Sequence, residues 1–156
     1  MSIRPAESND IPSIAELAEQ RRLQYQQYQP RFWRKADDAQ EKHTLLLQSL
    51  LTRENVIMLV HERTNVIDGF IIADFVEAPP VYNPGGPTCR VDDFCVASGS
   101  LWESTGLELL TEVLRKAKEH GAAQNVVVCG HLDQPKRTLL DHMGYSIASE
   151  WYVHDL

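Results

Sequence analysis

The chain has 156 residues, 43% of them hydrophobic and 24% charged, a composition typical of a globular domain that can bury a core. Its net charge of −7, with no basic cluster interleaved with aromatics, argues against a nucleic-acid partner. No apolar run is long enough to span a bilayer and no secretory signal opens the chain, so we expect a cytoplasmic protein outside the membrane.

The first predicted elements are a short strand and a long helix. The strand covers residues 3–6. Asn9 or Asp10 can cap the helix that follows, and Pro30 ends it. Arg21 falls on the apolar face of this helix, where we expect mainly its aliphatic stem to pack.

A second helix and a hairpin follow. Asp37 or Asp38 can cap the helix. The apolar runs 56–60 and 66–76 then flank a turn at Thr64–Asn65, which predicts two antiparallel strands. Residues 78–87 are rich in proline and glycine and form the one long loop, which is typical of functional or mobile segments.

The second half alternates strands and helices. A strand at 91–96 leads into a helix from about Leu101 to His120, and a strand at 125–129 leads into a helix with Pro135 in its first turn. A final strand is expected at 146–154. The crossover makes the strands at 91–96 and 125–129 parallel neighbours, and the whole chain, 1–156, is predicted to be a single α+β domain around one sheet.

Three cysteines are an odd number, and two of them lie in predicted strands, so we expect buried reduced thiols and not a disulfide framework. The spacing of histidine, cysteine and glutamate residues indicates no metal site.

Several short segments, in this order and spacing, carry a likeness to a known family. They are Ile3-Arg4-Pro5-Ala6 followed by Asn9-Asp10-Ile11, Asp68-Gly69-Phe70-Ile71, Asp93-Phe94-Cys95-Val96, Gly106-Leu107-Glu108-Leu109-Leu110 and Gly144-Tyr145. The chain resembles the GNAT superfamily, the acetyl-CoA-dependent N-acetyltransferases, as a divergent member. The resemblance implies an α/β/α arrangement, with a mixed sheet of about six strands flanked by about four helices.

The resemblance also implies where a cosubstrate binds. In the family two parallel neighbouring strands splay apart, and acetyl-CoA fits in the gap as a surrogate strand. Here Phe94, Cys95 and Val96 would offer backbone groups to its pantetheine, and the amide of Val96 or a neighbour would stabilise the oxyanion.

The family's pyrophosphate loop falls on residues 101–106. Only Gly106 matches its pattern, whereas Leu101 and Ser104 replace a polar residue and a glycine, and Glu103 adds a carboxylate near the phosphates. The Ser104 and Thr105 hydroxyls can donate to phosphate oxygens. An ordinary capped helix start is the alternative. The resemblance as a whole assigns cofactor binding to Phe94, Cys95, Val96, Trp102, Glu103, Ser104, Thr105, Gly106, Leu107, Asp133 and Lys136.

Two further roles follow the resemblance. Lys136, with Arg137, would clamp a phosphate of the cofactor or lie on a solvated basic face. The tyrosine that often protonates the departing thiolate is replaced by Leu140, so this role is vacant; His142, Tyr145, Cys129 and His131 are weak substitutes, and water can serve.

The candidate catalytic residues are Asp92 and Asp93, on the strand before the loop. Strand alternation puts their side chains on opposite faces. A buried aspartate has a raised pKa, which suits a base that deprotonates the amine. In the alternative, one carboxylate pairs with Arg90 or Lys136 and the other is solvated.

The candidate acceptor-binding residues are Tyr28, Phe32, Trp33 and Tyr82, which line a pocket or form core. The predicted function is transfer of an acetyl group from acetyl-CoA to a primary amine of a small molecule or peptide by direct attack. Alternatives are a catalytically silent module that binds a CoA-like ligand or a protein, and an enzyme using another acyl donor. The aromatic C-terminal strand could pair across a homodimer.

Overall fold

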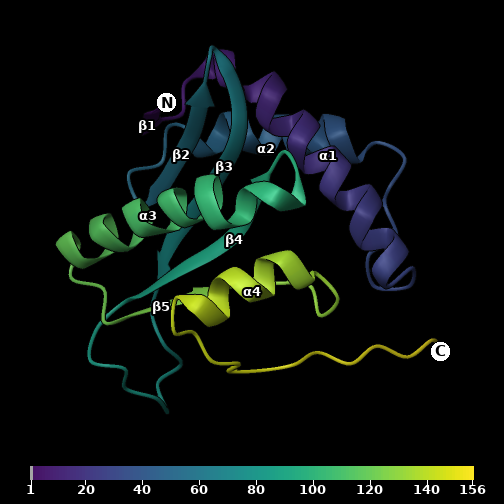
Figure 1. Cartoon of the computed structure of the whole chain (residues 1–156). Coiled ribbons are helices and arrows are strands. Elements are labelled where there is room, and N and C mark those ends of the chain that lie inside the picture. Colours follow the sequence, from purple (N-terminus) through teal and green to yellow (C-terminus); the bar gives the residue numbers. More distant parts are fainter. Residues whose placement is uncertain (1) are drawn as a thin grey trace.

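The computed structural model describes residues 2–156 (Figure 1). A five-stranded mixed sheet in the order β1-β2-β3-β4-β5 runs through the centre. The strands are β1 (Ser2–Pro5), β2 (Val56–Arg63), β3 (Val66–Val76), β4 (Thr88–Val96) and β5 (Gln124–Val127), and the helices are α1 (Ile11–Tyr28), α2 (Ala39–Leu50), α3 (Leu107–Glu119) and α4 (Gln134–His142).

The sheet is antiparallel from β1 to β4, and β5 then pairs with β4 in parallel. The turn between β2 and β3 has positive φ at Thr64 (52°) and Asn65 (62°), the geometry that a tight hairpin requires. The predicted hairpin and the predicted parallel crossover are therefore confirmed.

Helices cover both faces of the sheet, as Figure 1 shows. On one face α1 and α2 bury an apolar cluster, and on the other α3 and α4 bury a larger one. The first cluster includes Ile14, Ala18, Leu47, Val60 and Phe70; the second includes Ile71, Val91, Phe94, Leu109 and Leu139. The α/β/α arrangement implied by the resemblance is thus the observed one.

Asp10 stands at the start of α1, but its carboxylate does not cap that helix. It accepts two hydrogen bonds from Arg4, at 2.7 and 2.9 Å, and one from the Glu7 amide at 2.8 Å. The Arg4 guanidinium lowers the pKa of this carboxyl. Asp10 therefore ties β1 to the start of α1, which lies directly beside the edge of the sheet.

The predicted final strand at residues 146–154 is wrong, and the sheet has five strands. The segment runs as an extended chain past α4 without joining the sheet (Figure 1). Trp151 and Tyr152 are 83% and 90% exposed. A segment that buries so little apolar surface gains too little to offset its ordering. Its pairing across a homodimer stays a prediction.

Among residues 2–156, no helix combines the length and the apolar character needed to cross a bilayer. Within the same range, no group of three or more histidine, cysteine, aspartate or glutamate side chains is placed to hold a metal ion. Cys89, Cys95 and Cys129 are free thiols, as predicted, and the first two are buried.

Candidate functional site

The two parallel strands separate part of the way along β4. Their paired residues run from Thr88–Gln124 to Val91–Val127, and the last bond joins the Val128 amide to the Val91 carbonyl at 2.9 Å. β4 continues to Val96 without a partner on this side. The predicted splay between these strands is therefore present.

The unpaired stretch of β4 presents alternate backbone groups to the opening. The Ala97 amide donates to the Asp68 carbonyl at 2.8 Å, so residue 97 faces β3 and Val96 faces away from it. The Phe94 carbonyl accepts from the Lys136 ammonium at 3.5 Å, on the open side. Phe94 and Val96 are the residues whose backbone is available. Cys95, between them, turns its backbone toward β3, so that part of the expectation is wrong.

A β-bulge in β4 sets the direction of the two candidate catalytic carboxylates. Ile72 lies opposite Asp93 and Ala73 opposite Val91, which leaves Asp92 as an extra residue. Asp92 and Asp93 consequently line the same cavity, on the α1 side of the sheet. The prediction that they lie on opposite faces is wrong, because strict alternation does not hold through a bulge.

Asp93 is held in a tight ion-pair cluster. Its two carboxylate oxygens lie 2.7 Å from Arg21 on α1 and 2.9 Å from His43 on α2. Burial alone would raise the pKa of Asp93, but Arg21 and His43 outweigh it and lower the pKa to about 2. The expected rise is wrong. A carboxylate with so low a pKa is a weak base. Asp93 could therefore act as the base only if Arg21 and His43 moved away from it.

Asp92 differs from its neighbour. It is exposed and makes no ion pair with any residue of the described chain. The cavity that both carboxylates line has a volume of about 190 Å³, and its other walls are Arg21, Arg22, Tyr25, Trp33 and Val128. An exposed carboxylate beside an aromatic wall can bind a cationic amine.

Three of the four candidate acceptor-binding aromatics lie together next to this cavity. The Phe32 and Trp33 rings meet edge to face at 4.6 Å, and Tyr28 joins them through Tyr25. Trp151, from the C-terminal segment, extends the group with its ring 6.0 Å from Phe32. The aromatic group is therefore a real cluster, contacted by the segment that was predicted to be a strand.

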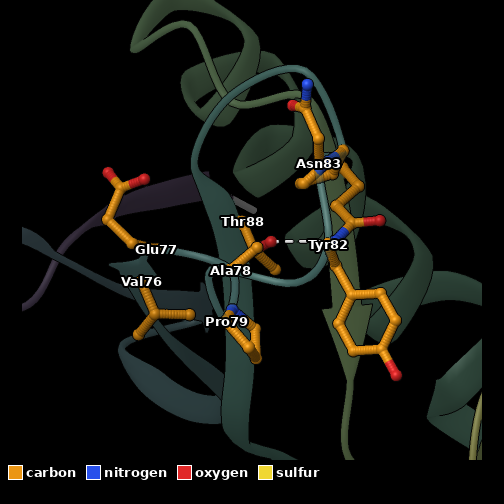
Figure 2. A pocket seen from close by; sticks show the side chains of 9 residues that line it. Val76, Glu77, Ala78, Pro79, Tyr82, Asn83 and Thr88 are labelled. Carbon is orange, nitrogen blue, oxygen red and sulfur yellow. Dashed lines mark hydrogen bonds between the residues drawn. The ribbon is translucent and has the colours of Figure 1, made fainter.

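Tyr82 is not part of this cluster. It is 72% exposed and lines a separate, open cavity of about 520 Å³ between the end of β3, the proline-rich loop and the start of β4. In this loop the Tyr82 amide donates to the Pro79 carbonyl at 2.9 Å. Figure 2 shows the side chains that line the cavity, among them Tyr82, Pro79 and Thr88. The structure thus places Tyr82 at the opposite end of β4 from Asp93.

The segment expected to be a pyrophosphate loop is helical. A 3₁₀ turn at Gly99–Leu101 and a π-helical turn at Trp102–Gly106 lead directly into α3. Trp102 is 6% exposed and packs edge to face on Phe94, with 4.8 Å between the ring centroids. The helical turns therefore begin at Gly99, two residues before the predicted start at about Leu101, and the free amides of the helix start lie at residues 98–100.

Side chains of this segment are committed to internal contacts. Thr105 is fully buried, and its hydroxyl lies 3.4 Å from both Asp68 and Arg63, so it does not face a phosphate site. Glu103 pairs with His142 of α4 at 2.9 Å. Ser104 and Leu107 are exposed. Of the two hydroxyls expected to donate to phosphate, only that of Ser104 is accessible.

Gly106 fits the family pattern for a packing reason. Its φ of −62° is ordinary helix, but an added Cβ would lie 2.8 Å from Trp102 and 3.3 Å from Leu139. We expect Gly106→Ala to lower the free energy of unfolding by about 1–3 kcal/mol through overpacking. Chemical denaturation measures this. Gly99→Ala is the control, since its Cβ would meet Pro135 at an ordinary 3.5 Å; equal stabilities of the two variants would contradict the packing account.

Lys136 and Asp133 lie inside the protein. Lys136 is 1% exposed, with its ammonium 5.2 Å from the Phe94 ring centroid and 5.5 Å from that of Trp102. It therefore lies on no solvated basic face. Asp133 accepts from the Tyr25 hydroxyl at 2.6 Å and from the Lys136 amide at 3.5 Å. These contacts join α1 to the start of α4 across the splay.

The roles of Arg21 and His43 in this site are not predicted from the sequence, whereas Tyr25 belongs to the aromatic group expected near the acceptor pocket. Arg21 was expected to contribute its stem, whereas its guanidinium binds Asp93. His43 gave no signal. The Tyr25 ring packs on Gly130, where an added Cβ would lie 2.9 Å away, and its hydroxyl accepts from the Gly130 amide at 3.2 Å. An arginine on an apolar helix face was the one available clue.

Comparison with known proteins gives matches in structure. No protein-family model matches the chain, and no curated protein matches it by sequence. Among solved structures, a tetramutant of the BH1408 protein from Bacillus halodurans is similar over 100% of both chains, with a TM-score of 0.85 and 16% identity. A predicted acetyltransferase with acetyl-CoA from Clostridium acetobutylicum is similar over 99% of this chain and 95% of that one, with a TM-score of 0.76 and 17% identity.

An aminoglycoside 6'-N-acetyltransferase from Acinetobacter haemolyticus is also similar, over 100% of this chain and 98% of that one, with a TM-score of 0.74 and 12% identity. These similarities show that the chain has the GNAT fold, as the sequence resemblance predicted. At such low identities they establish the fold and leave the activity to be argued from the site.

Proposed function

We propose that the protein transfers an acetyl group from acetyl-CoA to a primary amine by direct attack in a ternary complex. The observation that carries this proposal is the separation of β4 from β5 after Val91, which leaves the backbone of Phe94 and Val96 without a strand partner. An extended ligand with amide groups can pair there as a strand would. The Val96 amide, or a neighbouring one, then stabilises the oxyanion.

The acceptor amine would enter from the α1 side. Asp92 is exposed at the cavity of about 190 Å³, beside Trp33. In the proposal Asp92 binds the ammonium and, directly or through water, removes its proton, and the aromatic cluster binds the rest of the acceptor. Asp93 positions Arg21 and His43 instead of acting as the base, because its pKa is about 2.

A second function, binding of a CoA-like ligand without turnover, is favoured by one observation. Trp102 and Lys136 occupy the α4 side of the opening, and Thr105 is bonded internally, so the usual phosphate loop is absent. A protein that has lost this loop can keep the fold as a binding module.

Acetyl-CoA titration, followed by calorimetry and by thermal melting, tests both functions. Ligand at about 100 times its dissociation constant adds about 2.7 kcal/mol of stability. We expect a raised melting temperature with acetyl-CoA, and CoA release when a panel of small primary amines is added. Binding without CoA release across the panel would favour the module. An unchanged melting temperature at millimolar acetyl-CoA would remove both functions.

A further inference from the structure

Lys136 is a buried cation without a carboxylate partner. It lies in the first turn of α4 and is fully enclosed, yet no aspartate or glutamate in residues 2–156 is within ion-pair distance of its ammonium. Its contacts are the Phe94 carbonyl at 3.5 Å and the faces of Phe94 and Trp102. Burying an ammonium without a carboxylate costs more free energy than these weak contacts return. We therefore look for a functional role of Lys136, since it does not stabilise the fold.

The position of Lys136 on α4 indicates what this functional role is. Lys136 and Leu140 are four residues apart, so they share a face of the helix, with Lys136 one turn nearer the N-terminus. Leu140 stands where the resembling family carries its proton-donating tyrosine. The Lys136 side chain is long enough to reach from the turn before Leu140 to the unpaired part of β4, where its ammonium donates to the Phe94 carbonyl.

Other donors near the opening are already engaged. His142 pairs with Glu103 on the surface, and the Tyr145 hydroxyl donates to Asn125. The Cys129 thiol is directed to loop carbonyls, and burial raises its pKa to about 11. Lys136 is thus the donor that lies against the Phe94 carbonyl.

We propose that the Lys136 ammonium donates the proton that the CoA thiolate needs on departure. This inference rests on the proposed acetyl transfer. When pantetheine pairs with β4, one of its amides takes the Phe94 carbonyl and releases the ammonium toward the thioester sulfur. The acceptor nitrogen bonds to the carbonyl carbon, the carbon–sulfur bond breaks with its electron pair on sulfur, and one Nζ proton moves to sulfur.

The products are the N-acetyl amine, CoA as a thiol and a neutral lysine amine. The proton lost by the acceptor nitrogen leaves through Asp92 or water, and Lys136 is reprotonated from solvent before the next cycle. Burial lowers the pKa of Lys136, and Arg21 adds to this effect, which makes the ammonium a better acid. Cys129 and Cys95 face it from other parts of the chain, Asp133 stands at the start of its own helix, and all three act in the opposite direction.

The test uses Lys136→Met, which retains similar volume, and the control Lys118→Met, which removes an exposed lysine of α3. The readouts are acetyl-CoA affinity by calorimetry, the melting temperature, and single-turnover CoA release with hydroxylamine, an amine nucleophile too small to need an acceptor pocket. For Lys136→Met we expect release about 100-fold slower and an equal or higher melting temperature. The acetyl-CoA affinity should equal or exceed that of the wild type, because the ligand no longer displaces the ammonium from the Phe94 carbonyl. Lys118→Met should match the wild type.

The pH profile supplies a second readout. An acid must carry its proton, so the wild-type rate falls as pH rises through the pKa of Lys136, and Lys136→Met lacks this fall. If the wild type releases CoA and Lys136→Met stays within about threefold of it, the proton-donor role is overturned and acetyl transfer stands. An acetyl group found on Lys136 by mass spectrometry would also overturn it. A wild type that neither binds acetyl-CoA nor releases CoA would instead overturn the proposed function.

Discussion

Replacing Asp93 by asparagine is expected to lower the free energy of unfolding by about 3 kcal/mol at pH 7. The pKa of Asp93 is lowered to about 2, and a shift of this size corresponds to about 2–3 kcal/mol of stability. Asparagine also leaves the Arg21 guanidinium and the His43 ring without their anion. The Arg21 side chain is only 20% exposed and the His43 side chain only 10%, so water cannot take the place of the lost carboxylate effectively.

The sign of the pH dependence follows from the direction of the shift. A carboxyl whose pKa is lowered in the folded state stabilises the fold above its ordinary pKa of 3.8, and this contribution is lost as pH falls toward 2. The difference between wild type and Asp93→Asn should therefore be full at pH 7 and 5 and smaller at pH 3. Urea denaturation at each pH measures it.

Asp92→Asn is the matched control for Asp93→Asn. The two aspartates are adjacent and line one cavity, but Asp92 is exposed and makes no ion pair within the described residues. Its replacement should change stability by about 0.5 kcal/mol or less. Equal losses from the two variants would show that the Arg21–Asp93–His43 cluster does not stabilise the fold as argued.

Truncating Trp102 to alanine is expected to lower the free energy of unfolding by about 3–5 kcal/mol. The indole is 6% exposed, packs on the Phe94 ring at 4.8 Å and covers Gly106. Its removal opens a cavity beside the helical segment that replaces the phosphate loop. The same change removes one of the two aromatic faces next to the Lys136 ammonium.

Trp102→Phe is the control for Trp102→Ala. It keeps an aromatic ring against Phe94 and should lose less than half as much stability, since the loss grows with the volume of the cavity left. Chemical denaturation of both variants measures the difference. A loss below about 1 kcal/mol for the alanine variant would mean that neighbouring side chains collapse into the space, and the packing role assigned to Trp102 would be wrong.

Much of the fold could be predicted from local patterns in the sequence. The Thr64–Asn65 turn and the apolar runs on either side of it specify their strands through backbone conformation and hydrophobic period. The C-terminal segment could not be predicted in this way. Its composition fits a strand, but a strand also needs a partner and a buried face, which residues 146–154 lack.

The candidate site also has features that could be predicted from the sequence and features that could not. The family resemblance implied the splay, and the order of elements placed the carboxylates on β4. The sequence did not reveal the bulge at Asp92, because register depends on how β3 and β4 pair along their whole length. The sequence did predict a helix from about Leu101, which the structure confirms. It did not reveal the π-helical turn at Trp102–Gly106, because the buried Trp102 and Gly106 contacts beside it come from tertiary packing.

The sequence by itself determined the helices, the hairpin and the parallel crossover, because these follow from residues near one another in the chain, and the family resemblance supplied the α/β/α arrangement. Only the tertiary structure decided the chemistry of the opening. Arg21, His43 and Asp93 come from three different elements, and so do Tyr25, Phe94 and Lys136. Burial and charge at a site depend on which of these groups meet, and sequence spacing does not encode the distance between side chains on separate elements.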